Sequence, residues 1–214
     1  MRAYGIAVAR GIRIAETAVR FRLGPPSIKR FMIEVEIRAK VRDFESIKNK
    51  LNELNAKFVK TEKQADHIFG RAKDLDEEHK IIDGYFVARI RERDNKKSVE
   101  FKEIKRAGAG MEFSSPLASL ESGLNFLEKL DFVEAFTVSK VRETYNYQDF
   151  EICLDKVEQL GLFIEIEHPC KDDGDKTEAL KECQALLTII VPEAVVEPKK
   201  YGDLMQEVIN KNKG

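Results

Sequence analysis

Residues 32–40 read MIEVEIRAK, a stretch in which apolar and charged residues alternate strictly. Side chains of a β-strand alternate between its two faces, so the stretch predicts a strand with one apolar and one charged face. The apolar face is formed by Ile33, Val35, Ile37 and Ala39, and the charged face by Glu34, Glu36, Arg38 and Lys40. The charged residues of the other predicted strands explain why two acids and two bases share one face of this strand.

The same alternation returns in later stretches that also read as strands. Their charged positions are Arg89 and Arg91, Glu100 and Lys102, Lys140 and Arg142, Glu151 and Asp155 with Cys153 between them, and Glu165 with Glu167. For any single strand, the ordinary interpretation is a charged face in water. Taken together, acids gather on some strands and bases on others, whereas solvent faces usually mix small polar residues with charges.

Two helical stretches indicate an internal repeat. Residues 44–56 (FESIKNKLNELNA) align with residues 120–132 (LESGLNFLEKLDF), and each lies between a strand and three further strands. Repeats of this kind fix an architecture, although amphipathic helices also resemble one another by chance. We therefore expect an α+β fold: an eight-stranded antiparallel closed β-barrel, built from a repeated strand–helix–strands half, with the helices on the outside. Two further helices are expected near residues 177–190 and 201–209.

Composition excludes several classes of protein. The 214 residues are 43% hydrophobic and 35% charged, with a formal net charge of −1, so no global charge favours nucleic acid. The three cysteines, Cys153, Cys170 and Cys183, show no CxxC spacing and there are only three histidines, which disfavours a structural zinc site and is typical of reduced thiols in the cytoplasm. No apolar run approaches the roughly 18–20 residues that a membrane span needs.

The first 31 residues differ from the rest of the chain. They carry seven basic residues and one acid, and a Gly-Pro-Pro-Ser break at residues 24–27 precedes the first strand. A transit peptide has this composition. We favour instead a basic N-terminal extension, either flexible or encoded upstream of a true start at Met32, followed by a single domain over residues 32–210.

If helices cover the apolar faces of the strands, the charged faces suggest a binding site. The charges would then point into the lumen of the barrel. Carboxylates are the ligands that Mg²⁺ and Mn²⁺ prefer, and arginine and lysine bind phosphate oxygens. A lumen with both kinds of group would bind a polyphosphate together with its metal.

In these motifs the chain resembles the CYTH, or triphosphate tunnel metalloenzyme, family, which includes class IV adenylate cyclases, thiamine triphosphatases and inorganic tripolyphosphatases. The matching motifs are an ExExK-like strand with Arg38 at the lysine position, R-x-R, Phe-Lys, K-x-R, a late Asp, a second ExE and a closing K-Y-x-x-L at residues 200–204. They run in family order from residue 32 to about residue 205. The family fold is an eight-stranded tunnel made of a repeated half.

The resemblance implies a role for each matching residue. The implied ligands of Mg²⁺ or Mn²⁺ are Glu34, Glu36, Glu112, Asp155, Glu165 and Glu167. The implied triphosphate contacts are Arg89, Arg91, Lys102, Lys140, Arg142 and Lys200. The implied catalytic residues are Arg38, Lys40 and Lys102, where Lys40 lies on the same face as Arg38 and could replace the signature lysine. The segment at Glu112 lacks the family's flanking Arg and second Glu.

Three functions follow from the resemblance. The first is a metal-dependent cyclase that converts ATP to cyclic AMP and pyrophosphate; the second is a triphosphatase acting on tripolyphosphate or thiamine triphosphate. The third is a non-catalytic polyphosphate-binding module, which the departures at Arg38 and beside Glu112 motivate. No GxxxxGK[ST] loop is present for ordinary NTPase chemistry. The expected partner is a small-molecule triphosphate, without nucleic acid or membrane, and the resemblance allows a homodimer in the cytoplasm.

Overall fold

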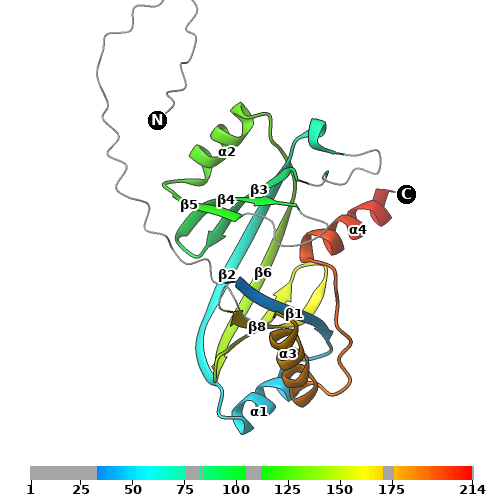
Figure 1. Ribbon diagram of the computed structural model, residues 1–214. Coiled ribbons are helices and arrows are strands. Elements are labelled where there is room, and N and C mark those ends of the chain that lie inside the picture. Colours follow the sequence, from blue (N-terminus) through cyan, green and yellow to red (C-terminus); the bar gives the residue numbers. More distant parts are fainter. Residues whose placement is uncertain (1–32, 76–81, 83, 105–111, 171–175, 214) are drawn as a thin grey trace, which may run out of the picture. The chain divides into compact units, whose positions relative to one another are not determined.

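The computed structural model describes residues 33–75, 82, 84–104, 112–170 and 176–213 (Figure 1). By its contacts the chain divides into two units, Met1–Phe31 and Met32–Gly214, and the fold below is that of the second unit. The prediction for residues 1–31 concerns a segment outside the described residues. The side chains of Glu34 and Glu112 also lie outside the description.

The described residues form eight strands, four α-helices and a short 3₁₀ helix, Ala72–Asp74. The first half contains β1 (Ile33–Val41), α1 (Glu45–Glu53), β2 (Lys57–Gly70), β3 (Phe86–Arg93) and β4 (Lys96–Glu103). The second half contains β5 (Glu112–Leu117), α2 (Leu120–Lys129), β6 (Val133–Tyr147), β7 (Phe150–Val157) and β8 (Gly161–Cys170). Two helices follow, α3 (Lys176–Ile190) and α4 (Tyr201–Lys213). The predicted repeat, strand–helix–three strands, is confirmed by this order.

The eight strands form one antiparallel sheet in the order β1-β8-β7-β6-β2-β3-β4-β5. The order is symmetric: each half gives its first strand to the edge of the other half, and the long strands β2 and β6 join the halves at the centre. Neither half can therefore complete its sheet alone. No hydrogen-bonded pair joins β1 to β5 in the described part of the chain, so the closed barrel expected from the sequence is not confirmed.

The apolar face of the sheet packs against three helices. Helices α1 and α3 cover β1, β7 and β8, where Ile37, Ile152, Ile164 and other apolar residues form a buried core. Helix α2 covers β3, with Leu127 against Ile90 in a second core. Burial of these apolar side chains is the main force that holds the helices to the sheet.

Helix α4 lies on the opposite, charged face. Its residues Tyr201 and Met205 pack against Val138 of β6, Val157 of β7 and Phe163 of β8. Val138 and Phe163 alternate in phase with the charged residues of their strands, so they belong to the charged face. The expectation that all helices lie outside the sheet is therefore wrong for α4, because this helix has an apolar stripe that one end of the charged face can bury.

Candidate functional site

The charged positions of β1, β8, β7, β6, β2, β3 and β4 lie on the same side of the sheet, and we call this side the charged wall. Residues paired across antiparallel strands share a face, and the register pairs Arg38 with Glu165, Arg142 with Asp155, and Arg91 with Asp66. These groups are not a solvent-facing surface: Asp155 is 0% exposed and Glu165 is 2% exposed. The ordinary interpretation of the charged faces is therefore wrong at the centre of the wall.

Arg142 connects the buried acids of the wall. Its guanidinium donates to both oxygens of Asp155 at 2.7 and 2.6 Å, and also donates to Glu165. Lys140 Nζ donates to Asp155 Oδ2 at 2.7 Å. Burial alone would raise the pKa of Asp155, but the hydrogen bonds from Arg142 and the charge of Lys140 outweigh it and lower this pKa. Asp155 is therefore held as a carboxylate.

Arg38, at the position of the signature lysine of the family, makes three hydrogen bonds on the charged wall. Its Nε donates to Glu165 Oε1 at 2.6 Å, its second nitrogen to the backbone oxygen of Lys199 at 2.9 Å, and its third to Glu36 at 3.3 Å. Burial would lower the pKa of Arg38, yet the charges of Glu165 and Glu36 outweigh it and raise this pKa. A guanidinium held in this way keeps its proton, so it can position acids or bind an anion but cannot accept a proton.

Tyr201 brings the start of α4 into the wall. Its hydroxyl donates to Asp155 Oδ2 at 3.0 Å. Its ring centroid lies 4.5 Å from the guanidinium carbon of Arg38 and 4.9 Å from Lys140 Nζ, within the range of cation–π contacts. Sequence reasoning assigned Tyr201 only to the closing motif. Its position between two cations and a buried carboxylate could not be read from spacing.

A second cluster lies on β2, β3 and β4. Arg91 donates to both oxygens of Asp66 at 2.6 Å each, while Arg89 lies 3.4 Å from Asp66 and donates from Nε to Glu100 at 2.8 Å. The sequence predicted the two arginines but gave no role to Asp66 or Glu100. The signal that could have found Asp66 is the alternation of Glu62, Gln64 and Asp66 along β2.

Lys102 of β4 lies close to Lys200, the residue that precedes α4, although the two are distant in the chain. Burial is the first cause that lowers the pKa of Lys200, and the positive charge of Lys102 is the second, while Glu36 opposes both. Since β1 and β4 stand far apart in the sheet order, contact among these groups requires a strongly curved sheet. The combined positive charge of two neighbouring ammonium groups favours the binding of an anion.

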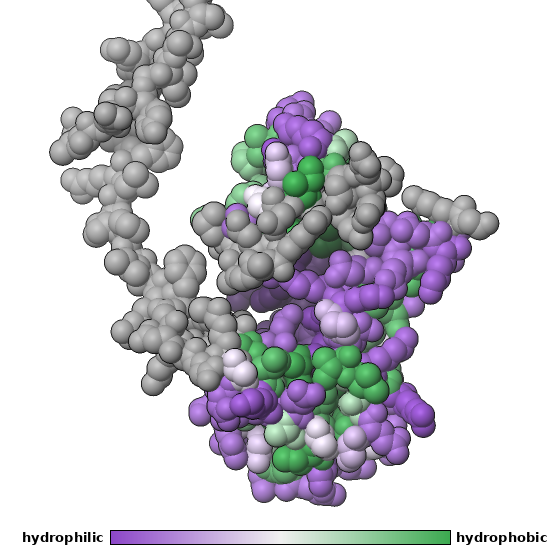
Figure 2. Space-filling view, turned by 45° about the vertical axis from the view of Figure 1, so that its right-hand side comes forward, coloured by the Kyte–Doolittle hydropathy of each residue, from purple (hydrophilic) through white to green (hydrophobic). Residues whose placement is uncertain are grey.

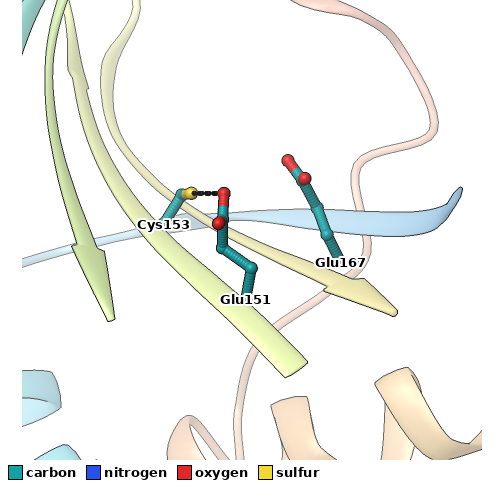
Figure 3. Close-up of side chains that lie close together, drawn as sticks. All are labelled: Glu151, Cys153 and Glu167. Carbon is teal, nitrogen blue, oxygen red and sulfur yellow. Dashed lines mark hydrogen bonds between the residues drawn. The ribbon is translucent and has the colours of Figure 1, made fainter. Parts of the chain in front are cut away.

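One group of side chains in the described residues has the geometry of a cation site. One ligand atom from each of Glu151, Cys153 and Glu167 lies within 4.8 Å of the others (Figure 3). Burial, opposed by Arg142 and supported by the charges of Glu165, Glu36 and Glu151, raises the pKa of Glu167 to about 7. This carboxylate therefore lies in an excess of negative charge that a cation would relieve.

The remaining predicted site residues are placed as follows. Glu36 is exposed and within 3.3 Å of Arg38, and Arg142 NH1 lies 3.7 Å from Glu167. Lys40 is exposed, with Nζ 5.8 Å from the ring centroid of Phe163, at the end of the wall that α4 covers. The structure thus brings most of the predicted residues onto one wall. The space-filling view in Figure 2 shows a broad band of hydrophilic residues around green, apolar patches.

The CYTH domain profile matches residues 32–199. The chain belongs to the CYTH domain family. A Methanocaldococcus jannaschii protein that is provisionally named an adenylate cyclase is 32% identical over 160 residues, covering 73% of this chain and 88% of the relative. The family resemblance stated from the motifs is thereby confirmed.

Solved structures of other proteins share the CYTH fold of this chain. The PH1012 protein of Pyrococcus horikoshii is 26% identical, with a TM-score of 0.62 over 79% of this chain and 97% of that one. A Hippeastrum protein, provisionally named an adenylyl cyclase and described as having a dominant triphosphatase activity, is 17% identical, with a TM-score of 0.60 over 82% of this chain and 96% of that one. At that identity the second likeness shows the fold alone.

Within the described residues, no helix combines the length and apolar character that crossing a bilayer requires.

Proposed function

We propose that this CYTH domain binds a triphosphate and a divalent cation on the charged wall and catalyses displacement at phosphorus. The observation that carries the proposal is the convergence of Lys102 and Lys200, two like charges from distant elements, beside the arginine pair Arg89 and Arg91. The positive charge gathered there is complementary to the oxygens of a triphosphate.

The donor set fits a hard divalent cation as well. Glu36 and Glu167 offer carboxylate oxygens at the rim of the wall, next to the arginine-bound Asp155 and Glu165. Mg²⁺ or Mn²⁺ at these oxygens would neutralise charge that develops on the phosphates during displacement. The chain's own cations would do the remaining work: Arg89, Arg91 and Arg142 bind phosphate oxygens and hold the triphosphate in line with the nucleophile.

The nucleophile decides the product. Attack of a ribose 3′-hydroxyl on the α-phosphate of ATP gives cyclic AMP and pyrophosphate, whereas attack of water on the terminal phosphate gives orthophosphate. We place the class IV adenylate cyclase reaction first, supported by the name of the 32% identical relative. Hydrolysis of tripolyphosphate or thiamine triphosphate is the second candidate, and the description of the Hippeastrum structure favours it.

A product-resolved turnover assay tests the proposal. Purified protein receives ATP, tripolyphosphate or thiamine triphosphate with Mg²⁺ or Mn²⁺, and the products are separated. Cyclic AMP with pyrophosphate supports the cyclase, and orthophosphate alone supports the triphosphatase. Arg89→Ala should abolish either activity, while Lys50→Ala, in an exposed ion pair on α1, should not change it. Saturable, cation-dependent binding of a triphosphate without turnover would support the non-catalytic binding module. If no triphosphate binds, the cyclase, the triphosphatase and the binding module are all overturned.

A further inference from the structure

Cys153 lies on the charged wall with its thiol between carboxylates. The register of β7 and β8 places Cys153 opposite Glu165, and the neighbouring pair on the same face is Glu151 and Glu167. The thiol is fully buried and donates to Glu151 Oε1 at 3.6 Å. Figure 3 shows Glu151 beside the thiol on β7 and the Glu167 side chain rising from the neighbouring strand β8. A sulfur donor therefore belongs to the surface that would otherwise offer only oxygen.

The separations suit a tetrahedral cation. Zn²⁺ binds sulfur at about 2.3 Å and carboxylate oxygen at about 2.1 Å, so a sulfur and an oxygen on one tetrahedral ion lie about 3.6 Å apart. The Sγ of Cys153 and Oε1 of Glu151 are 3.6 Å apart without any rearrangement. Glu167 completes the group within 4.8 Å and needs a movement of about 1 Å, which its side chain allows.

The charge around Glu151, Cys153 and Glu167 also favours a bound cation. Glu167 lies near Glu165, Glu36 and Glu151, and the cation nearest to it in the described residues, Arg142, also binds Asp155 and Glu165. Arg142 NH1 is 3.7 Å from Glu167, beyond hydrogen-bonding distance. The local excess of carboxylates over cations is the environment that a divalent ion stabilises.

We propose that Glu151, Cys153 and Glu167 form a binding site for one thiophilic divalent cation of the zinc class. Mg²⁺ and Ca²⁺ take oxygen ligands, whereas Zn²⁺ binds thiolate, so the sulfur selects against the hard cations. On binding, the thiol S–H bond breaks, the sulfur lone pair forms the metal bond, and one proton leaves to solvent without any redox change. Three protein ligands leave a fourth position open.

This site would also affect the proposed function, because Glu167 belongs to both donor sets. An ion of the zinc class bound at Cys153 would withdraw Glu167 from Mg²⁺ or Mn²⁺ and inhibit triphosphate turnover. The inference about the cation itself does not depend on turnover. Its test is therefore made without any triphosphate, so that failure of the site and failure of the proposed function give different results.

The test uses Co²⁺ as a spectroscopic probe for the zinc class. Wild-type protein titrated with Co²⁺ should show near-ultraviolet sulfur-to-cobalt charge transfer, release at least about one proton per ion, and lose the signal when Zn²⁺ is added. Cys153→Ser should lose the charge-transfer band. Cys183→Ser is the matched control, since that buried cysteine lies in the apolar core, with Sγ 3.9 Å from the backbone oxygen of Val35.

A second variant guards against misfolding of the first. Glu151 is exposed, so Glu151→Gln should fold normally and bind Co²⁺ at least about tenfold more weakly. The proposal is overturned if wild type gives no charge-transfer band, if the band survives in Cys153→Ser, if Glu151→Gln binds as wild type does, or if Mg²⁺ displaces Co²⁺ at similar concentrations.

Discussion

Asp66 binds Arg91 through two parallel hydrogen bonds, Nε to Oδ1 and NH2 to Oδ2, each 2.6 Å long. The same carboxylate lies 3.4 Å from Arg89 NH1. One acid of β2 thus fixes both arginines of β3, and the pair is oriented before any phosphate arrives. Because Asp66 already orders the arginines, less conformational entropy is lost when they bind an anion.

Replacing this acid tests what the arginines are for. Asp66→Asn removes the charged partner of Arg91 and one of the two carboxylates that Arg89 contacts, and loss of one member of a buried ion pair typically costs about 3–5 kcal/mol. We expect the free energy of unfolding, measured in urea, to fall by about 3 kcal/mol. Tripolyphosphate should then raise the melting temperature of Asp66→Asn more than that of wild type, because the anion takes the place of the carboxylate.

The control for this variant is Glu53→Gln, in the exposed Lys50–Glu53 pair. Exposed pairs contribute less than about 1 kcal/mol, so its stability should hardly change. An equal effect of tripolyphosphate on Asp66→Asn and wild type would contradict a phosphate role for Arg89 and Arg91.

Tyr201 contributes to the wall by its hydroxyl and by its ring, and two variants separate the contributions. Tyr201→Phe loses the hydrogen bond to Asp155 but keeps the ring between Arg38 and Lys140, so we expect a loss of about 1 kcal/mol. Tyr201→Leu also loses both cation–π contacts and should lose at least about 1 kcal/mol more. Thermal unfolding of the three proteins measures both steps; equal stability of the two variants would exclude a role for the ring.

Glu165 and Glu167 are neighbours in one ExE motif but should respond oppositely to neutralisation. The pKa of Glu167 is raised to about 7, above its ordinary value of 4.5, so the folded state holds this proton more tightly than the unfolded state. Its contribution to stability is therefore lost as pH rises from about 4.5 through 7. Glu167→Gln should be more stable than wild type at pH 8, by on the order of 3 kcal/mol, and equal to it near pH 4.

Glu165→Gln should instead destabilise the protein, because Arg38 and Arg142 both donate to this carboxylate. Urea unfolding of both variants between pH 4 and pH 8 checks the contrast. A Glu167→Gln protein less stable than wild type at pH 8 would show that the carboxylate excess does not exist.

Lys200 provides a variant that separates binding from stability. Burial and the charge of Lys102 lower its pKa, so Lys200→Ala removes a repulsion and should keep or raise stability. The same variant removes one anion contact, and we expect tripolyphosphate affinity, measured by calorimetry, to fall about tenfold, or about 1.4 kcal/mol. Unchanged affinity would remove Lys200 from the triphosphate site.

Much of the fold follows from local patterns in the sequence. Alternation with a period of two placed residues 35–40 of MIEVEIRAK on their correct faces, and the spacing of apolar residues located α1 and α2 in the repeat. Element bounds are harder to predict from such patterns, as the long strand β2, Lys57–Gly70, shows. Residues 57–61 of this strand are all exposed, so they lack the alternation of buried apolar and exposed polar residues by which a strand is recognised.

The sequence by itself determined the faces of the strands, the repeat and the family motifs, because these depend on residues close together in the chain. Only the tertiary structure decided which charges meet. Arg38 reaches Glu165 across 127 positions, and Tyr201 reaches Asp155 across 46. Such contacts depend on strand order, register and curvature, which the packing of the whole sheet sets. For the same reason, the place of α4 on the charged wall and the meeting of Cys153 with two carboxylates required the folded chain.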